Sequence, residues 1–464
     1  MTYGPSELVI DPVLVRKYNV TGPGYTSYPT ADRFVEAFNE ATYRYWLSSR
    51  NIGGIITPLS LYIHVPFCST GCFHGACNKR VTRNRSRAVQ YVRYLEREVN
   101  LTAGLLDENR RVTQIHWGGG TPTYLARDDI QAMCKALDGS FDIAADCEYS
   151  IEIDPREIQP GTIAFLGDLG FNRVSIGVQD FDPAVQKAVH RIQSEETVHR
   201  VTLEARAAEF RSISFDLIYG LPRQSLDSFN ATLDSVLALD PDRIALYSYA
   251  HLPDKFPAQR RIAESGLPSA ETKLQILTLA IGRLTGAGYV YIGMDHFAKP
   301  GDELSVAQRQ GRLHRNFQGY STRPDCDMLA FGTSAVSRVG PSYSQNVRDT
   351  TDYYAALDEA HLPVRTGVVL SKDDLLRRAV IQALLCQFRL SIESIETAYL
   401  VSFASYFSKE LEDLKVLEED GLVEIQPQWI VVTPKGRMLV RIACMVFDRY
   451  LREGSRWAGY SKVL

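Results

Sequence analysis

Three cysteines, Cys68, Cys72 and Cys77, lie close together directly after an apolar run at residues 61–65 that is typical of a buried strand. Glycines among the intervening residues favour turns, so the sequence presents three thiols on one loop at the end of a strand. Thiolates arranged in this way are typical ligands of an iron–sulfur cluster or of zinc. Structural thiols or a redox pair are the alternative, but clustered cysteines seldom serve packing alone. The spacing therefore predicts a metal centre with Cys68, Cys72 and Cys77 as its ligands.

Six strand-like runs alternate with helical patterns along the chain, and the run before the cysteines is the first of them. The other five lie at residues 112–117, 148–153, 173–178, 212–217 and 243–249. Apolar residues recur at helical spacing between residues 88 and 99, which predicts the first crossover helix. Alternation of this kind implies βα units, a parallel sheet and right-handed crossovers.

Residues suited to ligand contact stand where these strands end. The glycines at residues 118–120, followed by Thr121, come after the second strand, and bare backbone there could offer N–H donors to a charged ligand. The next four strands end at Glu152, Gln179, Asp216 and Ala250. Polar groups that recur at the ends of apolar strands are more typical of ligand contacts than of a core, so they predict a site at the carboxyl edge of the sheet.

Composition is typical of a globular enzyme. The chain has 464 residues, 45% of them hydrophobic, and 51 basic against 55 acidic residues gives a net charge of −4. That balance favours neither a nucleic-acid nor a membrane partner. We expect no signal peptide and no membrane span, because no apolar run has the necessary length. The remaining cysteines are scattered, which indicates reduced thiols and a cytoplasmic location.

The cysteine loop resembles that of the radical S-adenosylmethionine (SAM) enzymes, in particular the oxygen-independent coproporphyrinogen III oxidases of haem synthesis. That family's loop runs Cys-x-x-x-Cys-x-x-Cys-x-Cys-Asn-Lys, and its first three cysteines bind three irons of a 4Fe–4S cluster while SAM chelates the fourth. The likeness is nearly full-length. It includes residues 21–30, which are similar to Gly-Pro-Arg-Tyr-Thr-Ser-Tyr-Pro-Thr with Gly24 in place of Arg, and segments at 293–297 and 313–320.

The resemblance implies two bound SAM molecules. The first would be held by Tyr62, Gly119, Glu152 and Val336, with His74 at a position belonging to the same set. The second would contact Gly120, Thr121, Gln179, Arg191, Asp216 and Ala250. His190 is expected to be an exposed helical residue rather than a ligand.

The third ligand position of the family's loop is occupied here by Gly75. Cys77 could complete the three thiolates with a longer final spacing, which is the assignment we carry forward. His74 could instead supply an imidazole, as histidine does in some clusters. The cluster could be impaired, leaving a porphyrin-binding protein, or the recorded codon could differ by one base from a cysteine codon.

The resemblance also implies the architecture. An N-terminal arm (1–57) would precede a partial (β/α)6 radical SAM barrel with covering segments (58–365). A mainly helical, winged-helix-like domain (366–464) would follow. A winged helix suggests DNA binding, but the acidic residues 418–420 occupy the place of a basic wing, which favours a lid over the active site.

The implied function is the oxygen-independent oxidative decarboxylation of coproporphyrinogen III to protoporphyrinogen IX. A small electron donor such as flavodoxin or ferredoxin would serve a monomeric enzyme. The five basic residues between 79 and 87 are either a solvated helix start or a receptor for carboxylates of the tetrapyrrole or of the donor. A haem-trafficking homologue and an inactive paralogue with an impaired cluster are the alternatives.

Overall fold

One 12-stranded sheet organises the chain in the computed structural model, which describes residues 7–51, 56–75, 80–324, 326–454, 460, 462 and 463. Its centre consists of β1 (Leu59–Val65), β4 (Arg111–Gly119), β5 (Asp142–Ile153), β6 (Arg173–Gln179), β7 (Ser212–Tyr219) and β8 (Arg243–Ser248). These strands pair in parallel, in chain order. The six predicted strands are therefore all present, and their carboxyl ends lie at the same edge.

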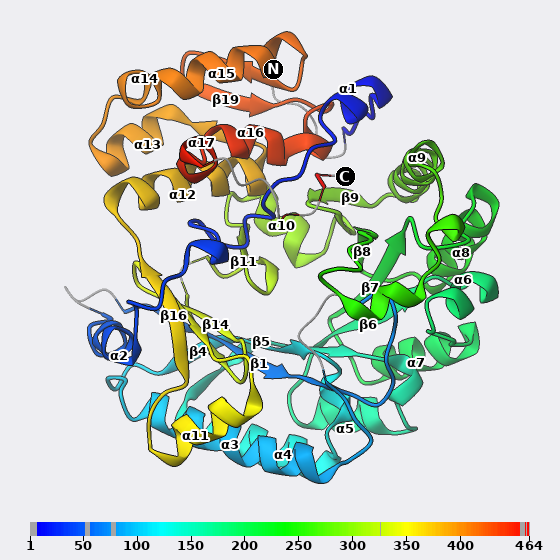
Figure 1. Cartoon of the computed structure of the whole chain (residues 1–464), viewed down its shortest axis with the longest axis vertical. Coiled ribbons are helices and arrows are strands. Elements are labelled where there is room, and N and C mark those ends of the chain that lie inside the picture. The colour runs from blue at the N-terminus through cyan, green and yellow to red at the C-terminus, as the bar shows by residue number, and fades with distance from the viewer. Residues whose placement is uncertain are drawn as a thin grey trace.

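Helices connect the parallel strands and cover the outside of the sheet (Figure 1). They are α3 (Ser86–Ala103), α4 (Arg127–Ser140), α5 (Thr162–Asp168), α6 (Pro183–Ala188), α7 (Glu195–Ala207), α8 (Leu226–Leu239) and α9 (Ala270–Gly286). In α3 the residues at helical spacing, from Ala88 to Val99, are buried, as the pattern predicts. Among the described residues, no helix is both long and apolar enough to cross a bilayer.

Shorter strands extend the sheet at both edges. On one side β13 (Asp327–Phe331) pairs in parallel with β1, and β14 (Val336–Val339), β15 (Ser342–Asn346) and β16 (Val364–Val369) continue antiparallel. On the other side β10 (His296–Ala298) and β9 (Val290–Gly293) follow β8. Sequence patterns gave no strands here, because runs of three to six residues are too short for a clear period.

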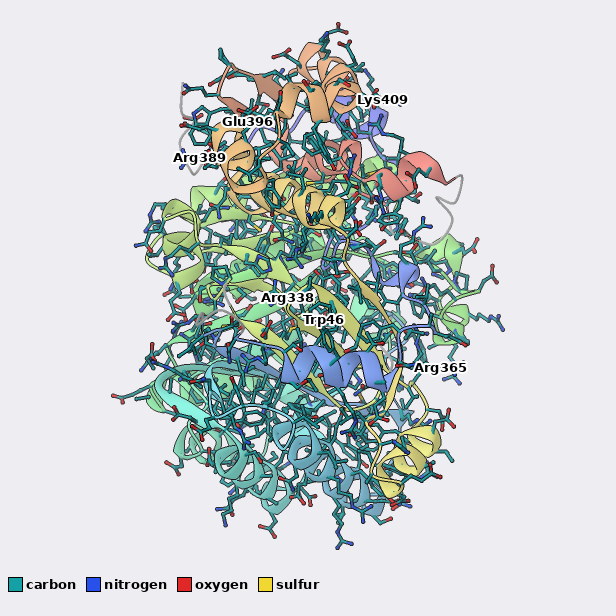
Figure 2. The ribbon with its side chains drawn as sticks, turned by 90° about the vertical axis from the view of Figure 1, so that its left-hand side faces the viewer. Trp46, Arg338, Arg365, Arg389, Glu396 and Lys409 are labelled. Carbon is teal, nitrogen blue, oxygen red and sulfur yellow. The ribbon has the colours of Figure 1, made fainter. Side chains whose placement is uncertain are left out.

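The C-terminal region forms a separate layer at the top of Figure 1. It contains α12 (Lys372–Gln387), α13 (Ile392–Tyr399), α14 (Phe403–Tyr406), α15 (Ser408–Glu419), α16 (Val440–Val446), α17 (Arg449–Glu453) and a sheet of β17 (Arg389–Ser391), β19 (Trp429–Val432) and β18 (Val423–Ile425). On the face drawn in Figure 2, Arg389 and Lys409 are accompanied by Glu396, whereas Trp46 and Arg365 mark the lower part of the molecule. The labelled side chains of this layer thus include both cationic and anionic groups.

The N-terminal arm joins the two layers. It contains α1 (Pro12–Lys17) and α2 (Glu40–Ser48), and it passes from beside the C-terminal helices to beside the sheet (Figure 1). Tyr25 is buried and its hydroxyl donates to Asp448 Oδ2 over 3.1 Å, while Val35 N donates to Gly367 O over 2.8 Å. Val463 N, near the end of the chain, donates to Val20 O. The arm is therefore bonded to the C-terminal layer, to β16 and to the last described residues of the chain.

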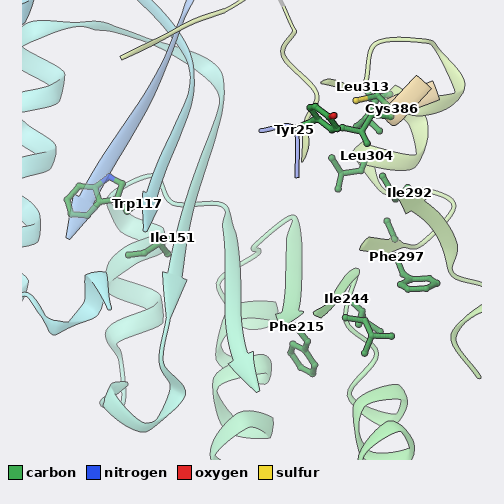
Figure 3. Close-up of a cluster of buried hydrophobic side chains, with 14 of the residues drawn as sticks. Tyr25, Trp117, Ile151, Phe215, Ile244, Ile292, Phe297, Leu304, Leu313 and Cys386 are labelled. Atoms are coloured by element: carbon green, nitrogen blue, oxygen red, sulfur yellow. The ribbon is translucent and has the colours of Figure 1, made fainter. Parts of the chain in front are cut away.

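A continuous hydrophobic core runs through these parts. Figure 3 shows members of it from the sheet, the arm and the C-terminal layer: Trp117, Ile151, Phe215, Ile244, Ile292, Phe297, Leu304, Leu313, Tyr25 and Cys386. Because the arm and α12 contribute to the same core as the sheet, we expect their positions over the sheet to be fixed by apolar packing.

A buried carboxylate fastens α3 to the antiparallel edge. Glu98, 3% exposed, accepts hydrogen bonds from Gly332 N (2.8 Å), Asn346 Nδ2 (2.6 Å) and the Tyr353 hydroxyl (2.5 Å). Burial raises the pKa of Glu98 to about 7, although the three hydrogen bonds act in the opposite direction. The folded protein therefore binds a proton here that the unfolded chain releases in the same pH range.

This raised pKa makes stability fall with pH. Between about pH 4.5 and pH 7 the folded state holds the Glu98 proton and the unfolded state does not, so the free energy of unfolding decreases as pH rises, by up to about 3 kcal/mol from this group. In Glu98→Gln that decrease should be missing. Urea unfolding at pH 5 and pH 7.5 measures it, with Glu96→Gln on the same helix as the control. Equal pH dependence in the wild type and Glu98→Gln would contradict the assignment.

Candidate active site

A cavity of about 590 Å³ opens at the carboxyl ends of the central strands. Its wall includes most of the residues that the sequence singles out: Cys68, Cys72, His74, Gly119, Gly120, Thr121, Glu152, Gln179, Arg191, Asp216 and Ala250. Tyr62 and Val336 do not line it, and Cys77 lies outside the described residues. The residues at the strand ends therefore line one cavity, and that they contact a ligand there stays a prediction.

The cysteine loop is held by contacts to a distant turn. Phe73 N donates to Val189 O over 3.0 Å, and the Phe73 ring stacks on His190 with ring centroids 5.0 Å apart. His190 Nδ1 lies 2.9 Å from Gly71 O. His190 is exposed but follows α6 in a left-handed conformation, so the prediction that it is helical is wrong. Protein contacts therefore position this loop before any ligand is considered.

Two guanidinium groups converge on Cys72. Arg156 Nη2 and Arg191 Nη1 each lie 3.5 Å from its sulfur, and Asp154 pairs with both arginines, at 2.6 and 3.0 Å. Burial alone would raise the pKa of Asp154, but the hydrogen bond from Arg156 and the charge of Arg191 hold that pKa below its usual value. The cationic donors complement a negatively charged sulfur, which is the form that binds iron.

The glycine turn after β4 needs its glycines for close packing. Gly119 has φ +110°, and a Cβ there would lie 2.6 Å from the His64 ring. Its N–H donates to Glu152 Oε2 (3.2 Å), and those of Gly120 and Thr121 donate to Val65 O and Phe67 O, both over 2.8 Å. The N–H groups of Gly119, Gly120 and Thr121 therefore all have acceptors within the protein, so in this structure none of the three is a free donor for a ligand.

Glu152 stands at the end of a chain of aromatic residues. His116 Nε2 lies 3.2 Å from Glu152 Oε1, and Tyr62 stacks on His116 with centroids 5.9 Å apart. Burial would raise the pKa of Glu152, but the contact and charge of His116 and the Gly119 N–H keep it lowered. Tyr62 does not line the cavity, but it stacks on His116, which contacts the cavity residue Glu152. Val336 lies on β14, at the antiparallel edge of the sheet.

Asp216 lines the cavity together with Glu152 and Asp154, and Ser175 Oγ donates to it over 3.1 Å. Burial, followed by the negative charge of Glu152, raises the pKa of Asp216 to about 7. A cationic ligand between the two carboxylates would relieve their repulsion. The site thus combines carboxylates for a cation with arginines for an anion, which suits an amino acid group.

Gln259 is a site residue that the sequence did not reveal. It is 1% exposed, and its Nε2 donates to His74 O (3.3 Å) and Ala250 O (3.2 Å). It therefore ties the cysteine loop to the end of β8. Gln259 lies in a short 3-10 helix, Pro257–Arg261, whose polar sequence carries no signal of burial. Arg156 was missed for the same reason, because a polar residue after a strand has no periodicity.

The described residues supply only part of a cluster site. Cys68 and Cys72 line the cavity, 6% and 5% exposed, and Gly75 lines it without a side chain. Within the described ranges, no three His, Cys, Asp or Glu side chains are grouped to hold a metal ion. Cys68 and Cys72 can therefore supply two of the three thiolates that a 4Fe–4S cluster with an open iron needs, and Cys77 lies outside the described residues.

Two family models match the chain. The model of the radical SAM superfamily matches residues 62–236, and that of the HemN C-terminal domain matches residues 370–439. The first range contains the cysteine loop and the cavity carboxylates Glu152, Asp154 and Asp216.

Known proteins resemble the chain over nearly its whole length. Oxygen-independent coproporphyrinogen III oxidases from Salmonella typhimurium and Escherichia coli are 48% and 47% identical to it, each over 98% of this chain and 98% of the relative. A solved structure described as coproporphyrinogen III oxidase (HemN) from Escherichia coli, a radical SAM enzyme, superposes with a TM-score of 0.91 at 45% identity, covering 96% of this chain and 100% of that one.

The raised pKa of Asp216 predicts how a cationic ligand should bind. SAM carries a sulfonium charge, so its affinity should rise roughly eightfold between pH 6 and pH 7.5 as Asp216 ionises. Asp216→Asn should weaken SAM binding and abolish the rise of its affinity with pH. Glu152, His116 and Arg191, the other charged or titratable groups that act on Asp216, remain in this variant. Isothermal titration calorimetry measures the SAM affinity at the two pH values, and Asp168→Asn, at an exposed position, is the control. An unchanged pH profile in Asp216→Asn would exclude Asp216 from the ligand contacts.

Proposed function

Since the chain belongs to the oxygen-independent coproporphyrinogen III oxidase family of the radical SAM superfamily, we propose that it converts coproporphyrinogen III to protoporphyrinogen IX in haem synthesis. Each of two propionate groups would lose a hydrogen atom, carbon dioxide and one electron, and become a vinyl group. The observation that carries the proposal is the identity of 48% over 98% of both chains. The convergence of the strand-end residues on one cavity supports it.

Membership of the superfamily implies a 4Fe–4S cluster and SAM as cofactors. We propose Cys68, Cys72 and Cys77 as the cluster ligands, the last on the basis of sequence alone. When bound, a reduced cluster supplies the electron that cleaves SAM and starts the radical reaction. The protein's own part is to bind, orient and exclude water.

Side chains of the first cavity could bind and orient SAM. Glu152 would face the cationic portion of the first SAM, while Asp216 and Arg191 would face the cationic portion and the carboxylate of the second. Gln259 would keep the cysteine loop over the strand ends. Two SAM molecules remain our proposal, with the first at Tyr62, His74, Gly119, Glu152 and Val336 and the second at Gly120, Thr121, Gln179, Arg191, Asp216 and Ala250.

We also propose a division into an arm (1–57), a partial (β/α)6 barrel with covering segments (58–365) and a winged-helix-like lid domain (366–464). The six parallel strands support the barrel, and the match at residues 370–439 supports the last part. A monomer in the cytoplasm, reduced by flavodoxin or ferredoxin, completes the proposal.

Anaerobic turnover tests the function. The purified protein with coproporphyrinogen III, SAM and a reductant should form protoporphyrinogen IX together with methionine and deoxyadenosine, detected by chromatography after oxidation of the porphyrinogens. Omission of SAM is the control. Haem binding and transfer without any vinyl product would instead favour the trafficking alternative.

The third cluster ligand is tested by two substitutions. If Cys77 is that ligand, Cys77→Ser should abolish both the cluster absorbance and SAM cleavage, because two thiolates do not hold the cluster. If the site is impaired, Gly75→Cys should raise both. Iron and sulfide content after anaerobic purification is the measurement. Cys134→Ser, whose hydroxyl can keep the contact that the thiol makes with Tyr149, is the control. Unchanged iron content in both variants would reject a cluster on this loop.

A further inference from the structure

A second cavity of about 540 Å³ adjoins the first. The two share the stretch that ends β8 and the residues after it: Tyr247, Ser248, Tyr249, Ala250 and Leu252. The rest of its wall comes from the arm, from the segments after α9 and from the C-terminal layer, including Thr21, Gly24, Met294 and Val463. A ligand larger than SAM could therefore extend from the strand ends into this second space.

Positive charge dominates the second cavity. Its wall carries four cations, Lys273, Arg315, Arg441 and Lys462, against the single carboxylate of Asp295. They come from α9, from β11 (His314–Asn316), from α16 and from the last residues of the chain. Within the described ranges, neither Lys273 nor Arg315 forms an ion pair with a carboxylate. Four cations drawn from separate elements favour an anionic ligand with more than one charge.

Arg315 has an unused donor in this cavity. Its Nε donates to Gly24 O over 3.3 Å, and its guanidinium lies 4.9 Å from the centre of the Tyr320 ring. Its Nη1 is buried and has no hydrogen-bond partner among the described residues. Buried donors are rarely left unpaired, so this nitrogen indicates an acceptor that the protein itself does not supply.

The other cations are held in place around it. Arg441, 7% exposed, donates through Nη1 to Gly22 O over 3.1 Å and through Nη2 to Lys462 O. Lys273 Nζ donates to Tyr249 O over 2.9 Å. Burial, followed by the charge of Lys462, lowers the pKa of Lys273 to about 8, and a bound anion would favour its charged form. The set is therefore preorganised rather than mobile.

The shared wall is less polar. Tyr247, Tyr249 and Leu252 line both cavities. Tyr247 is 41% exposed, which is high for a large aromatic side chain and leaves it available to a ligand. An apolar wall flanked by cations suits a large ring with peripheral carboxylates.

We propose that the second cavity binds propionate groups of the tetracarboxylate macrocycle, with Arg315 and Lys273 as the anchoring residues. The proposal rests on the proposed function, because it places that substrate against the shared wall. One edge of the macrocycle would then face the first cavity, where the reacting propionate meets the cofactors. Arg315 and Lys273 are positioning residues in this scheme, since they hold propionates that are not reacting.

Binding of coproporphyrin III, the stable oxidised tetracarboxylate, tests the proposal without cluster or turnover. Fluorescence titration of the full-length protein should give tighter binding of coproporphyrin III than of a dicarboxylate porphyrin, and little binding of octaethylporphyrin, which has no carboxylates. Arg315→Gln and Lys273→Met should each weaken coproporphyrin binding at least about 10-fold, the loss typical of one charge-assisted hydrogen bond. Arg312→Gln, an exposed residue near β11, should bind like the wild type.

One further variant and three outcomes separate the possibilities. Arg315→Lys keeps the charge and should lose less affinity than Arg315→Gln, which covers the case in which the glutamine variant fails to fold. Wild-type affinity in folded Arg315→Gln and Lys273→Met, equal binding of octaethylporphyrin, or full competition by millimolar phosphate would each overturn the proposal.

Failure of the proposed function can be told apart from failure of this inference. Charge-dependent coproporphyrin binding without any vinyl product would uphold the cavity and reject the reaction. Turnover in which Arg315→Gln and Lys273→Met both leave KM unchanged would uphold the reaction and reject the cavity assignment.

Discussion

Parallel pairing of six strands is the constraint on which the rest of the structure depends. Because β1 and β4 to β8 pair in parallel and in chain order, every strand ends at the same edge, and residues far apart in sequence meet there. Glu152, Gln179 and Asp216 share one cavity for this reason alone. The antiparallel strands at both edges widen the sheet without contributing to that meeting point, which explains why Val336 on β14 stays outside the cavity.

Charge is separated between the two adjoining cavities. The first brings Glu152 and Asp216 together and shifts their pKa values in opposite directions. His116 and the Gly119 N–H lower the pKa of Glu152, whereas at Asp216 burial and the charge of Glu152 outweigh the Ser175 hydrogen bond and the charges of Arg191 and His116. The second gathers cations from elements that only tertiary packing brings near. A ligand that reaches across the shared wall would therefore meet opposite fields at its two ends, which fixes its orientation as well as its affinity.

Prediction from the sequence succeeded where a regular pattern of apolar residues marks a strand and a polar residue marks its end. Apolar strands with polar ends gave the six central strands and the cavity carboxylates. The glycine turn was located correctly, yet its N–H groups bond to Glu152, Val65 and Phe67, which depends on β1 and β5 lying beside it. Gln259 and Arg156 could not be found, because their roles arise from contacts to His74 and Cys72 across the cavity.

The cysteine loop shows how far the protein alone determines a cofactor site. Its described part is fixed on one side by the contacts of Phe73 to Val189 and His190, and on the other by the hydrogen bond from Gln259 to His74. These contacts do not depend on the side chain at position 75. The loop therefore keeps Cys68 and Cys72 against the cavity whatever completes the ligand set, so losing one thiolate alters the chemistry that the loop can support before it alters the fold.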